Sequence, residues 1–188
     1  MEGNARFVSQ QSIDVNEGAD RRVAVSKGQK PFAGIIGCVD SRVAPELVFD
    51  RGLGDLFTSR VAGAIADDSA IGSVEFGVLE FKIPLLIVLG HSNCGAVKAT
   101  IEAVETNNFR APGQIGAIVS HIVPAVRAAI ADGCHGPELV AQSIVGTVRA
   151  TVAALTSSEV LAPLITTGHL KVVGATYDLG TGVVTHLA

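Results

Sequence analysis

Several residue types are scarce in this chain of 188 residues. Tryptophan is absent, aromatic residues make up 4% of the sequence and charged residues 17%. The formal net charge is -4, and no stretch of the chain is rich in Lys and Arg. Nucleic-acid-binding proteins carry such a basic stretch or stripe, so we expect no nucleic-acid partner.

Long uninterrupted apolar runs are also lacking, although 48% of the residues are hydrophobic. A membrane-spanning helix needs about 20 predominantly apolar residues, and the longest apolar runs here are interrupted by Gly or Pro. We therefore expect no membrane partner. We interpret the high apolar content as a subunit interface and predict a homo-oligomer.

The chain holds only three cysteines, too few for a disulfide scaffold and odd in number. Its first residues show no basic region followed by an apolar stretch, so no signal peptide is predicted. Free thiols persist in a reducing compartment. These features together predict a cytoplasmic protein whose thiols bind a metal.

The chain alternates predicted strands with predicted helices and contains no linker or internal repeat, which indicates a single domain over residues 1–188. Apolar runs predict strands at residues 32–37, 55–62, 84–89 and 169–177, with 183–187 returning as an antiparallel edge hairpin after a Gly-Thr-Gly turn. The predicted fold class is α/β, with a mostly parallel central sheet flanked by helices.

Helical patterns fill most of the remaining sequence. Residues 1–30 are polar and predict an N-terminal arm with one or two short helices. Asp68 or Ser69 is predicted to cap the helix that follows the second strand, and another helix is predicted to begin near Gly95. Further helices are predicted at residues 45–49, 115–130 and 138–155, with a loop at 107–113.

Two short segments carry the chemistry. C-V-D-S-R begins at Cys38 and H-S-N-C-G at His91, and each ends a predicted buried strand. Sites in α/β proteins form at the carboxyl ends of parallel strands, so Cys38, His91 and Cys94 can meet there. Two thiols and one imidazole give only three strong ligands for zinc, which is the outline of a catalytic rather than a structural site.

Asp40 and Arg42 alternate with Cys38 along the chain, so an extended segment would aim all three side chains the same way. A surface ion pair is the alternative interpretation of this pair. The third cysteine, Cys134, is predicted to be a packing residue. No metal role is predicted for the other histidines, which are His121, His135, His169 and His186.

With these residues assembled, the chain resembles a β-class carbonic anhydrase. The matching text is C-V-D-S-R-V from Cys38, G-D-L-F from Gly54 and G-H-S-N-C-G-A from Gly90, supported by matches near both termini. Gln29 and Pro31 resemble the G-Q-x-P segment of the plant-type branch. That branch keeps the fourth position of its zinc open for water.

The resemblance implies one Zn²⁺ per chain, bound by Cys38, His91 and Cys94, with Asp40 and Arg42 as the catalytic dyad. Asp40 would become a metal ligand only if the site were closed. A homodimer is the implied minimum unit, and tetramers are common in the family.

The resemblance also implies a small substrate pocket that a neighbouring subunit completes in part. Its implied lining residues are Phe57 and Phe76. We also expect Ile35 to extend the apolar wall, and the Gln29 amide and the Gly95 N–H, at a predicted helix start, to bind an oxygen of the substrate. The chain departs from the plant-type pattern in two places. Phe76 stands where those members have Tyr, and the segment R-V-A-G-A at residues 60–64 replaces a commoner R-N-A-G-N.

The implied activity is zinc-dependent, reversible hydration of CO2 to bicarbonate and a proton, through zinc-bound hydroxide. Asp40 would orient that hydroxide, and Arg42 would hold Asp40 away from the metal. Two alternatives share the same ligands: a zinc hydrolase acting on CS2 or COS, and a non-catalytic zinc-binding homologue. No histidine is assigned as a proton shuttle.

Overall fold

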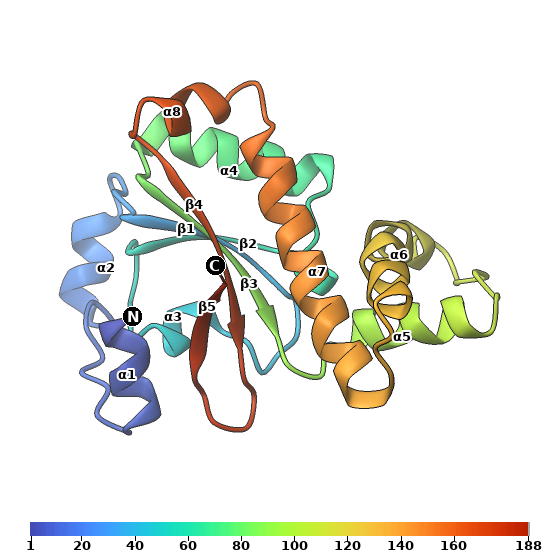
Figure 1. Ribbon diagram of the computed structural model, residues 1–188. Coiled ribbons are helices and arrows are strands. Elements are labelled where there is room, and N and C mark those ends of the chain that lie inside the picture. Colours follow the sequence, from blue (N-terminus) through green and yellow to red (C-terminus); the bar gives the residue numbers. More distant parts are fainter. Residues whose placement is uncertain (188) are drawn as a thin grey trace.

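The computed structural model describes residues 1–187, built around a five-stranded sheet in the order β2-β1-β3-β4-β5 (Figure 1). Strands β1 to β4 are parallel, and β5 runs antiparallel to β4 at the edge. The predicted α/β fold class is therefore confirmed. The strands are β1 (Ala33–Gly37), β2 (Leu56–Arg60), β3 (Leu85–His91), β4 (Lys171–Tyr177) and β5 (Val184–Leu187).

Helices pack on the sheet and extend beyond it (Figure 1). Helix α4 contacts β1 and β2, α7 contacts β3 and β4, and α5 and α6 pack with α7 beyond the sheet. The helices are α1 (Glu2–Val8), α2 (Ala19–Val25), α3 (Pro45–Val48), α4 (Asp68–Phe81), α5 (Gly95–Glu105), α6 (Ile115–Ala131), α7 (Gly136–Thr156) and α8 (Ala162–Thr166), with a 3₁₀ turn, η1, at Ala62–Ala64.

Strand β1 is buried along its whole length, whereas β3 and β4 also carry half-buried residues. All five residues of β1 are buried, which explains why its sequence is a continuous apolar run rather than an alternating one. Helix α7 approaches β3 so closely that a Cβ on Gly90 would lie 2.6 Å from a methyl of Val148. Glycine at this position therefore lets α7 pack on the strand that ends in the motif H-S-N-C-G.

Several element boundaries differ from the sequence predictions for local reasons. Asp67, rather than Asp68 or Ser69, caps α4 by accepting a hydrogen bond from the Ala70 N–H. The second strand ends at Arg60 because Gly63, with φ of +76°, turns the chain into η1. Helix α8 was not predicted, since its five residues show no clear helical period.

Helix α7 is long and apolar enough to cross a membrane by length and composition alone. It is not an uninterrupted apolar run, because it contains Gln142, Gly146 and Arg149. A core helix can meet the same criteria, and α7 packs against β3, β4 and α6. Its buried face carries Leu139, Ile144, Val148 and Leu155.

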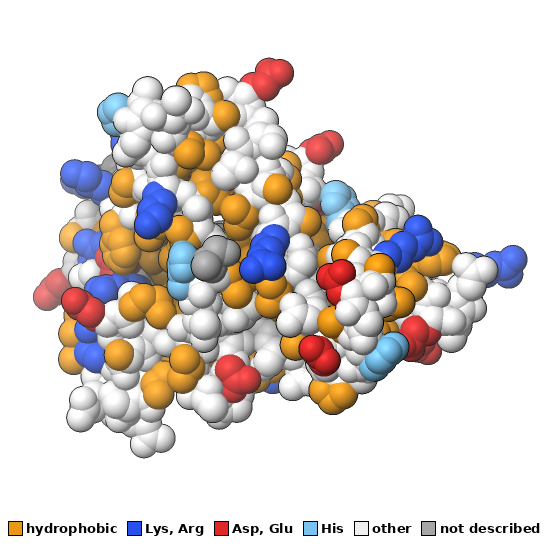
Figure 2. All heavy atoms as spheres, in the orientation of Figure 1, with side chains coloured by type: hydrophobic (Ala, Val, Ile, Leu, Met, Phe, Trp, Pro, Cys, Tyr) orange, Lys and Arg blue, Asp and Glu red, His pale blue; other side chains and the backbone are white. Residues whose placement is uncertain are grey.

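On the face that Figure 2 shows, patches of exposed hydrophobic side chains lie among scattered charged ones. A cavity of about 390 Å³ lies against the sheet and is lined mainly by apolar residues, including Ile35, Ile87 and Val173. Phe76 is 57% exposed and Leu79 is 50% exposed on α4. A substantial share of the apolar side chains therefore lies outside the core of a single chain.

The predicted N-terminal arm forms α1 and α2, and α1 is fixed to the body by the buried side chain of Asn4. The Asn4 amide donates to the Val48 carbonyl at 3.1 Å and to the Gly182 carbonyl at 2.8 Å. Its carbonyl oxygen accepts from the Val184 N–H at 2.9 Å. One side chain thus ties α1 to α3 and to the start of β5.

We predict that Asn4→Ala lowers the free energy of unfolding by about 2–4 kcal/mol, because it leaves buried backbone groups without partners. Denaturant unfolding measures the change. Asn108→Ala, at an exposed asparagine, is the control and should stay within about 0.5 kcal/mol of the parent. Equal effects of the two substitutions would contradict this account of the arm.

Candidate metal centre

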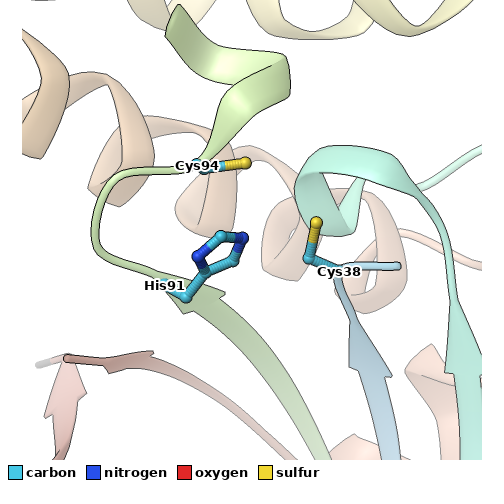
Figure 3. Close-up of side chains that lie close together, drawn as sticks. All are labelled: Cys38, His91 and Cys94. Atoms are coloured by element: carbon cyan, nitrogen blue, oxygen red, sulfur yellow. The ribbon is translucent and has the colours of Figure 1, made fainter. Parts of the chain in front are cut away.

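The strand order brings the two sequence motifs together. Cys38 directly follows β1, His91 is the last residue of β3, and these strands are parallel neighbours in which Gly37 pairs with Leu89. Cys94 lies at the N-cap of α5. The ligand atoms of the three residues lie within 4.8 Å of one another, and all three side chains are buried (Figure 3).

His91 is oriented as a metal ligand. Its Nδ1 lies 2.9 Å from the Ser92 carbonyl oxygen, which can only accept a hydrogen bond, so Nδ1 carries the proton. Its Nε2 is buried and has no hydrogen-bond partner among the described residues. A buried polar atom without a partner is costly. A metal ion bound between this nitrogen and the two sulfur atoms would remove that cost, and the donor set suits Zn²⁺.

When no metal is bound, the pKa of one thiol is lowered and that of the other is raised. The hydrogen bond from Cys94 lowers the pKa of Cys38 to about 4 against the opposing effect of burial, with further help from His91 and from the N–H groups of Asp40 and Gly63. The same hydrogen bond, together with burial, raises the pKa of Cys94. Metal binding as a dithiolate therefore has to displace the Cys94 proton.

A carboxylate lies beside this group and is held by an arginine. Arg42 donates from Nε to Oδ1 of Asp40 at 2.9 Å, from Nη2 to Oδ2 at 2.7 Å, and from its backbone N–H to Oδ1 at 3.0 Å. These bonds hold the pKa of Asp40 well below its usual range. Oδ2 lies 3.9 Å from Nε2 of His91, so the ionised carboxylate borders the metal-ligand group.

The carbonic anhydrase family model matches residues 33–184 of the chain. The chain belongs to the carbonic anhydrase family. A carbonic anhydrase of Mycolicibacterium smegmatis is 40% identical over 183 residues, which are 96% of this chain and 86% of that protein.

Solved structures place this family member in the β class. The Coccomyxa β-carbonic anhydrase in complex with acetazolamide matches with a TM-score of 0.79 and 27% identity, over 99% of this chain and 83% of that one. A tetrameric β-carbonic anhydrase of Sordaria macrospora has the same fold, with a TM-score of 0.80 and 21% identity over 100% of this chain and 94% of that one.

Of the other predicted site residues, Gly95 lies beside the metal-ligand group, whereas Gln29 and Ile35 do not. Gly95 adjoins Cys94 as the first residue of α5. Gln29 precedes the amino end of β1, whereas Cys38 follows its carboxyl end. The side chain of Ile35 is fully buried in a cluster with Leu89 and Tyr177, which is separate from the cluster that holds Cys38 and Cys94.

The two predicted pocket phenylalanines contact a third aromatic ring instead of the metal-ligand group. The ring centroids of Phe57 and Phe76 lie 5.8 and 5.9 Å from that of Phe81. A single chain thus does not bring these rings to the three metal-binding side chains. The prediction that they line a substrate pocket therefore requires a neighbouring subunit.

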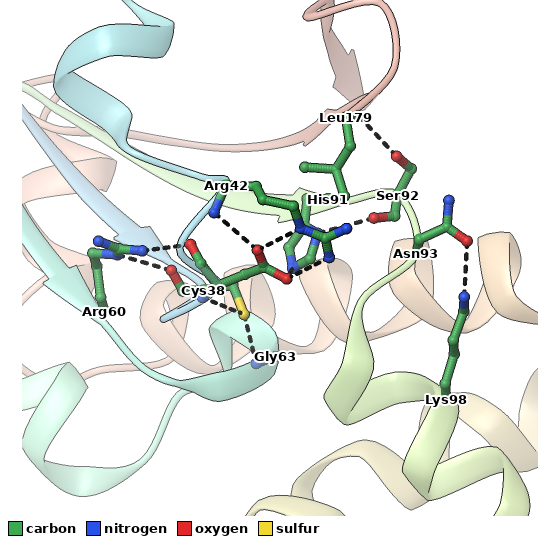
Figure 4. A network of polar contacts seen from close by, with 10 residues as sticks. Cys38, Arg42, Arg60, Gly63, His91, Ser92, Asn93, Lys98 and Leu179 are labelled. Atoms are coloured by element: carbon green, nitrogen blue, oxygen red, sulfur yellow. Dashed lines mark hydrogen bonds and ion pairs between the residues drawn. The ribbon is translucent and has the colours of Figure 1, made fainter.

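Sequence reasoning missed three residues that support the metal-ligand group (Figure 4). Gly63 donates its N–H to the Cys38 sulfur at 3.4 Å. The Ser92 hydroxyl accepts from the Leu179 N–H at 2.9 Å, which holds the carbonyl that orients His91. Arg60 donates to the backbone that follows Cys38. Ser92 lies inside the H-S-N-C-G motif, and Arg60 and Gly63 lie in the segment R-V-A-G-A at residues 60–64. The sequence does not show what these residues contact, because the contacts of Arg60 and Gly63 depend on which strands pair.

We predict that the purified chain binds about one Zn²⁺ per chain and that Cys94→Ser loses most of this zinc, because serine is a poor zinc ligand near neutral pH. Elemental analysis after dialysis measures the ratio. Cys134→Ser is the matched control, since Cys134 is buried but lies outside the metal-ligand group. Zinc loss in the control equal to that in Cys94→Ser would contradict the assignment.

Proposed function

We propose that the chain catalyses the reversible hydration of CO2 to bicarbonate and a proton, with one Zn²⁺ held by Cys38, His91 and Cys94. The observation that carries the proposal is the buried group of three metal-binding side chains beside an ion-paired carboxylate. The three side chains would hold the ion, and when bound it would supply hydroxide near neutral pH by lowering the pKa of a water molecule.

Asp40 and Arg42 are proposed to keep one side of the metal free of protein ligands. The two-pronged pairing with Arg42 engages both carboxylate oxygens of Asp40. An ionised carboxylate accepts hydrogen bonds, so Asp40 can orient the attacking nucleophile from where it lies. If Arg42 released it, the same carboxylate could move onto the metal and close the site.

The backbone N–H of Gly95 is proposed to bind an oxygen of CO2 or bicarbonate. Gly95 is the first residue of α5, whose N-terminal N–H groups favour partial negative charge on a ligand. The substrate itself carries no net charge, so an apolar wall suits it. Phe57, Phe76 and Ile35, with the Gln29 amide, remain the proposed wall and its polar contact.

A homodimer or tetramer is proposed because that wall is incomplete in one chain. Phe76 is largely exposed, and the surface carries further exposed apolar side chains. A second copy could bring its aromatic rings to the metal site of the first. The reducing cytoplasm is the proposed location, since both thiol ligands must stay unoxidised to bind zinc.

We predict that CO2 hydration by the zinc-loaded protein increases from about pH 6.5 to about pH 9. Two thiolate ligands would cancel the charge of Zn²⁺ and make it a weaker Lewis acid than an ion held by three neutral imidazoles, so we expect the active form at higher pH. Stopped-flow measurement with a pH indicator gives the profile. A flat profile would contradict the argument from ligand charge.

The same zinc-loaded samples distinguish CO2 hydration from the alternative hydrolase activity. Sulfide release from COS or CS2 is assayed in parallel with CO2 hydration. Sulfide release without CO2 hydration at pH 8.5 would overturn the proposed substrate, and neither activity at one zinc per chain would indicate a non-catalytic homologue.

We predict that Arg42→Ala lowers kcat for CO2 hydration at least about tenfold while the protein keeps its zinc. The substitution removes the donors that hold Asp40 away from the metal and ionised. Stopped-flow kinetics and elemental analysis are measured on the same preparation. Arg22→Ala, at an exposed arginine of α2, is the control; full activity in Arg42→Ala would exclude the proposed role.

A further inference from the structure

Arg60 makes two contacts to the backbone of the metal-ligand segment. It is the last residue of β2 and lies opposite Gly37 in the pairing with β1. Its Nε donates to the Cys38 carbonyl at 2.9 Å, and its Nη2 donates to the Asp40 carbonyl at 2.7 Å (Figure 4). One guanidinium therefore spans the backbone from a metal ligand to the neighbouring carboxylate residue.

These contacts take over where the backbone hydrogen bonds between β1 and β2 end. The last bond of the β1–β2 edge runs from the Val61 N–H to the Gly37 carbonyl at 2.9 Å. The following carbonyl, that of Cys38, has left the strand and is bound by the Arg60 side chain instead. A guanidinium is planar and its donors are rigidly spaced, so it can fix two carbonyls relative to each other.

The charge of Arg60 has no carboxylate partner within ion-pair distance among residues 1–187. Both of its identified hydrogen bonds go to backbone oxygens of this one segment. The segment in turn presents the Asp40 N–H to the Cys38 sulfur at 3.5 Å. The orientation of a metal ligand and that of the carboxylate thus depend on the same short piece of backbone.

We propose that Arg60 is a positioning residue that fixes the backbone from Cys38 to Asp40, and through it the metal ligand and the carboxylate. Both identified hydrogen bonds of Arg60 go to carbonyl oxygens, and neither goes to a metal-binding atom or to the Asp40 side chain. The effect on catalysis rests on the proposed function, whereas the effect on metal retention does not.

Loss of Arg60 has two expected consequences. Water replaces the guanidinium at both carbonyls, so the backbone beside Cys38 becomes less ordered and zinc is released faster. Asp40, with Arg42 still bound to it, no longer lies at a fixed distance from His91, so kcat decreases. KM changes little, because no contact to the substrate is removed.

The test compares Arg60→Gln and Arg60→Lys with Arg149→Ala, a control at an exposed arginine of α7. Zinc release to a chromogenic chelator is measured without substrate, and kcat and KM for CO2 hydration are measured separately. We expect Arg60→Gln to release zinc about tenfold faster and to lose about tenfold or more in kcat. Arg60→Lys should be intermediate, because an ammonium group is a point charge that cannot reproduce the planar fork.

Two results would overturn the proposal. Unchanged zinc release and kcat in folded Arg60→Gln would show that the contacts position nothing. A raised KM or weakened bicarbonate inhibition, with zinc release and kcat unchanged, would make Arg60 a ligand contact instead. Arg60→Lys decides in the same way if Arg60→Gln does not fold. If the parent protein fails to hydrate CO2, the proposed function fails, but zinc release still tests Arg60.

Discussion

The parallel pairing of β1 with β3 is the constraint on which the rest of the site depends. The register that pairs Gly37 with Leu89 makes both strands end side by side, so that Cys38 and His91 meet although they are far apart in the sequence. Helix α7 holds β3 from one face through the close contact at Gly90. Cys94 then needs only the short turn before α5 to complete the group.

The polar side chains around Cys38 and His91 include an ionised carboxylate, that of Asp40, and two arginines fix the segment that carries it. A buried imidazole nitrogen is costly when it has no hydrogen-bond partner, and Nε2 of His91 has none among the described residues. A metal ion bound there would remove that cost. Arg42 holds the Asp40 carboxylate ionised beside it, and Arg60 holds the backbone of the same segment. Two arginines thus contact the same short loop: Arg42 binds the Asp40 carboxylate, and Arg60 binds backbone carbonyl oxygens.

The fold class could be predicted from the sequence because buried parallel strands are continuous apolar runs. The group of three metal-binding residues could be predicted because both motifs directly follow such runs, at the end of the sheet where sites form. It could not predict the role of Arg60, since that contact depends on β2 lying beside β1 in one particular register. Asp67 was missed as the cap of α4 because its two neighbours are equally good capping residues. The roles of Phe57 and Phe76 stay predictions, because residues supplied across a subunit interface are not fixed by the fold of one chain.

The central claim is that three protein ligands hold zinc while Asp40 is kept off its fourth position. A crystal structure of the zinc-loaded protein at about pH 8.5, with anomalous data collected at the zinc edge, tests this most directly. The account predicts one zinc per chain, with bonds of about 2.3 Å to the sulfur atoms of Cys38 and Cys94 and a bond to Nε2 of His91, while Asp40 stays paired with Arg42. A carboxylate oxygen of Asp40 bonded to the zinc, or zinc bound at other residues, would contradict it.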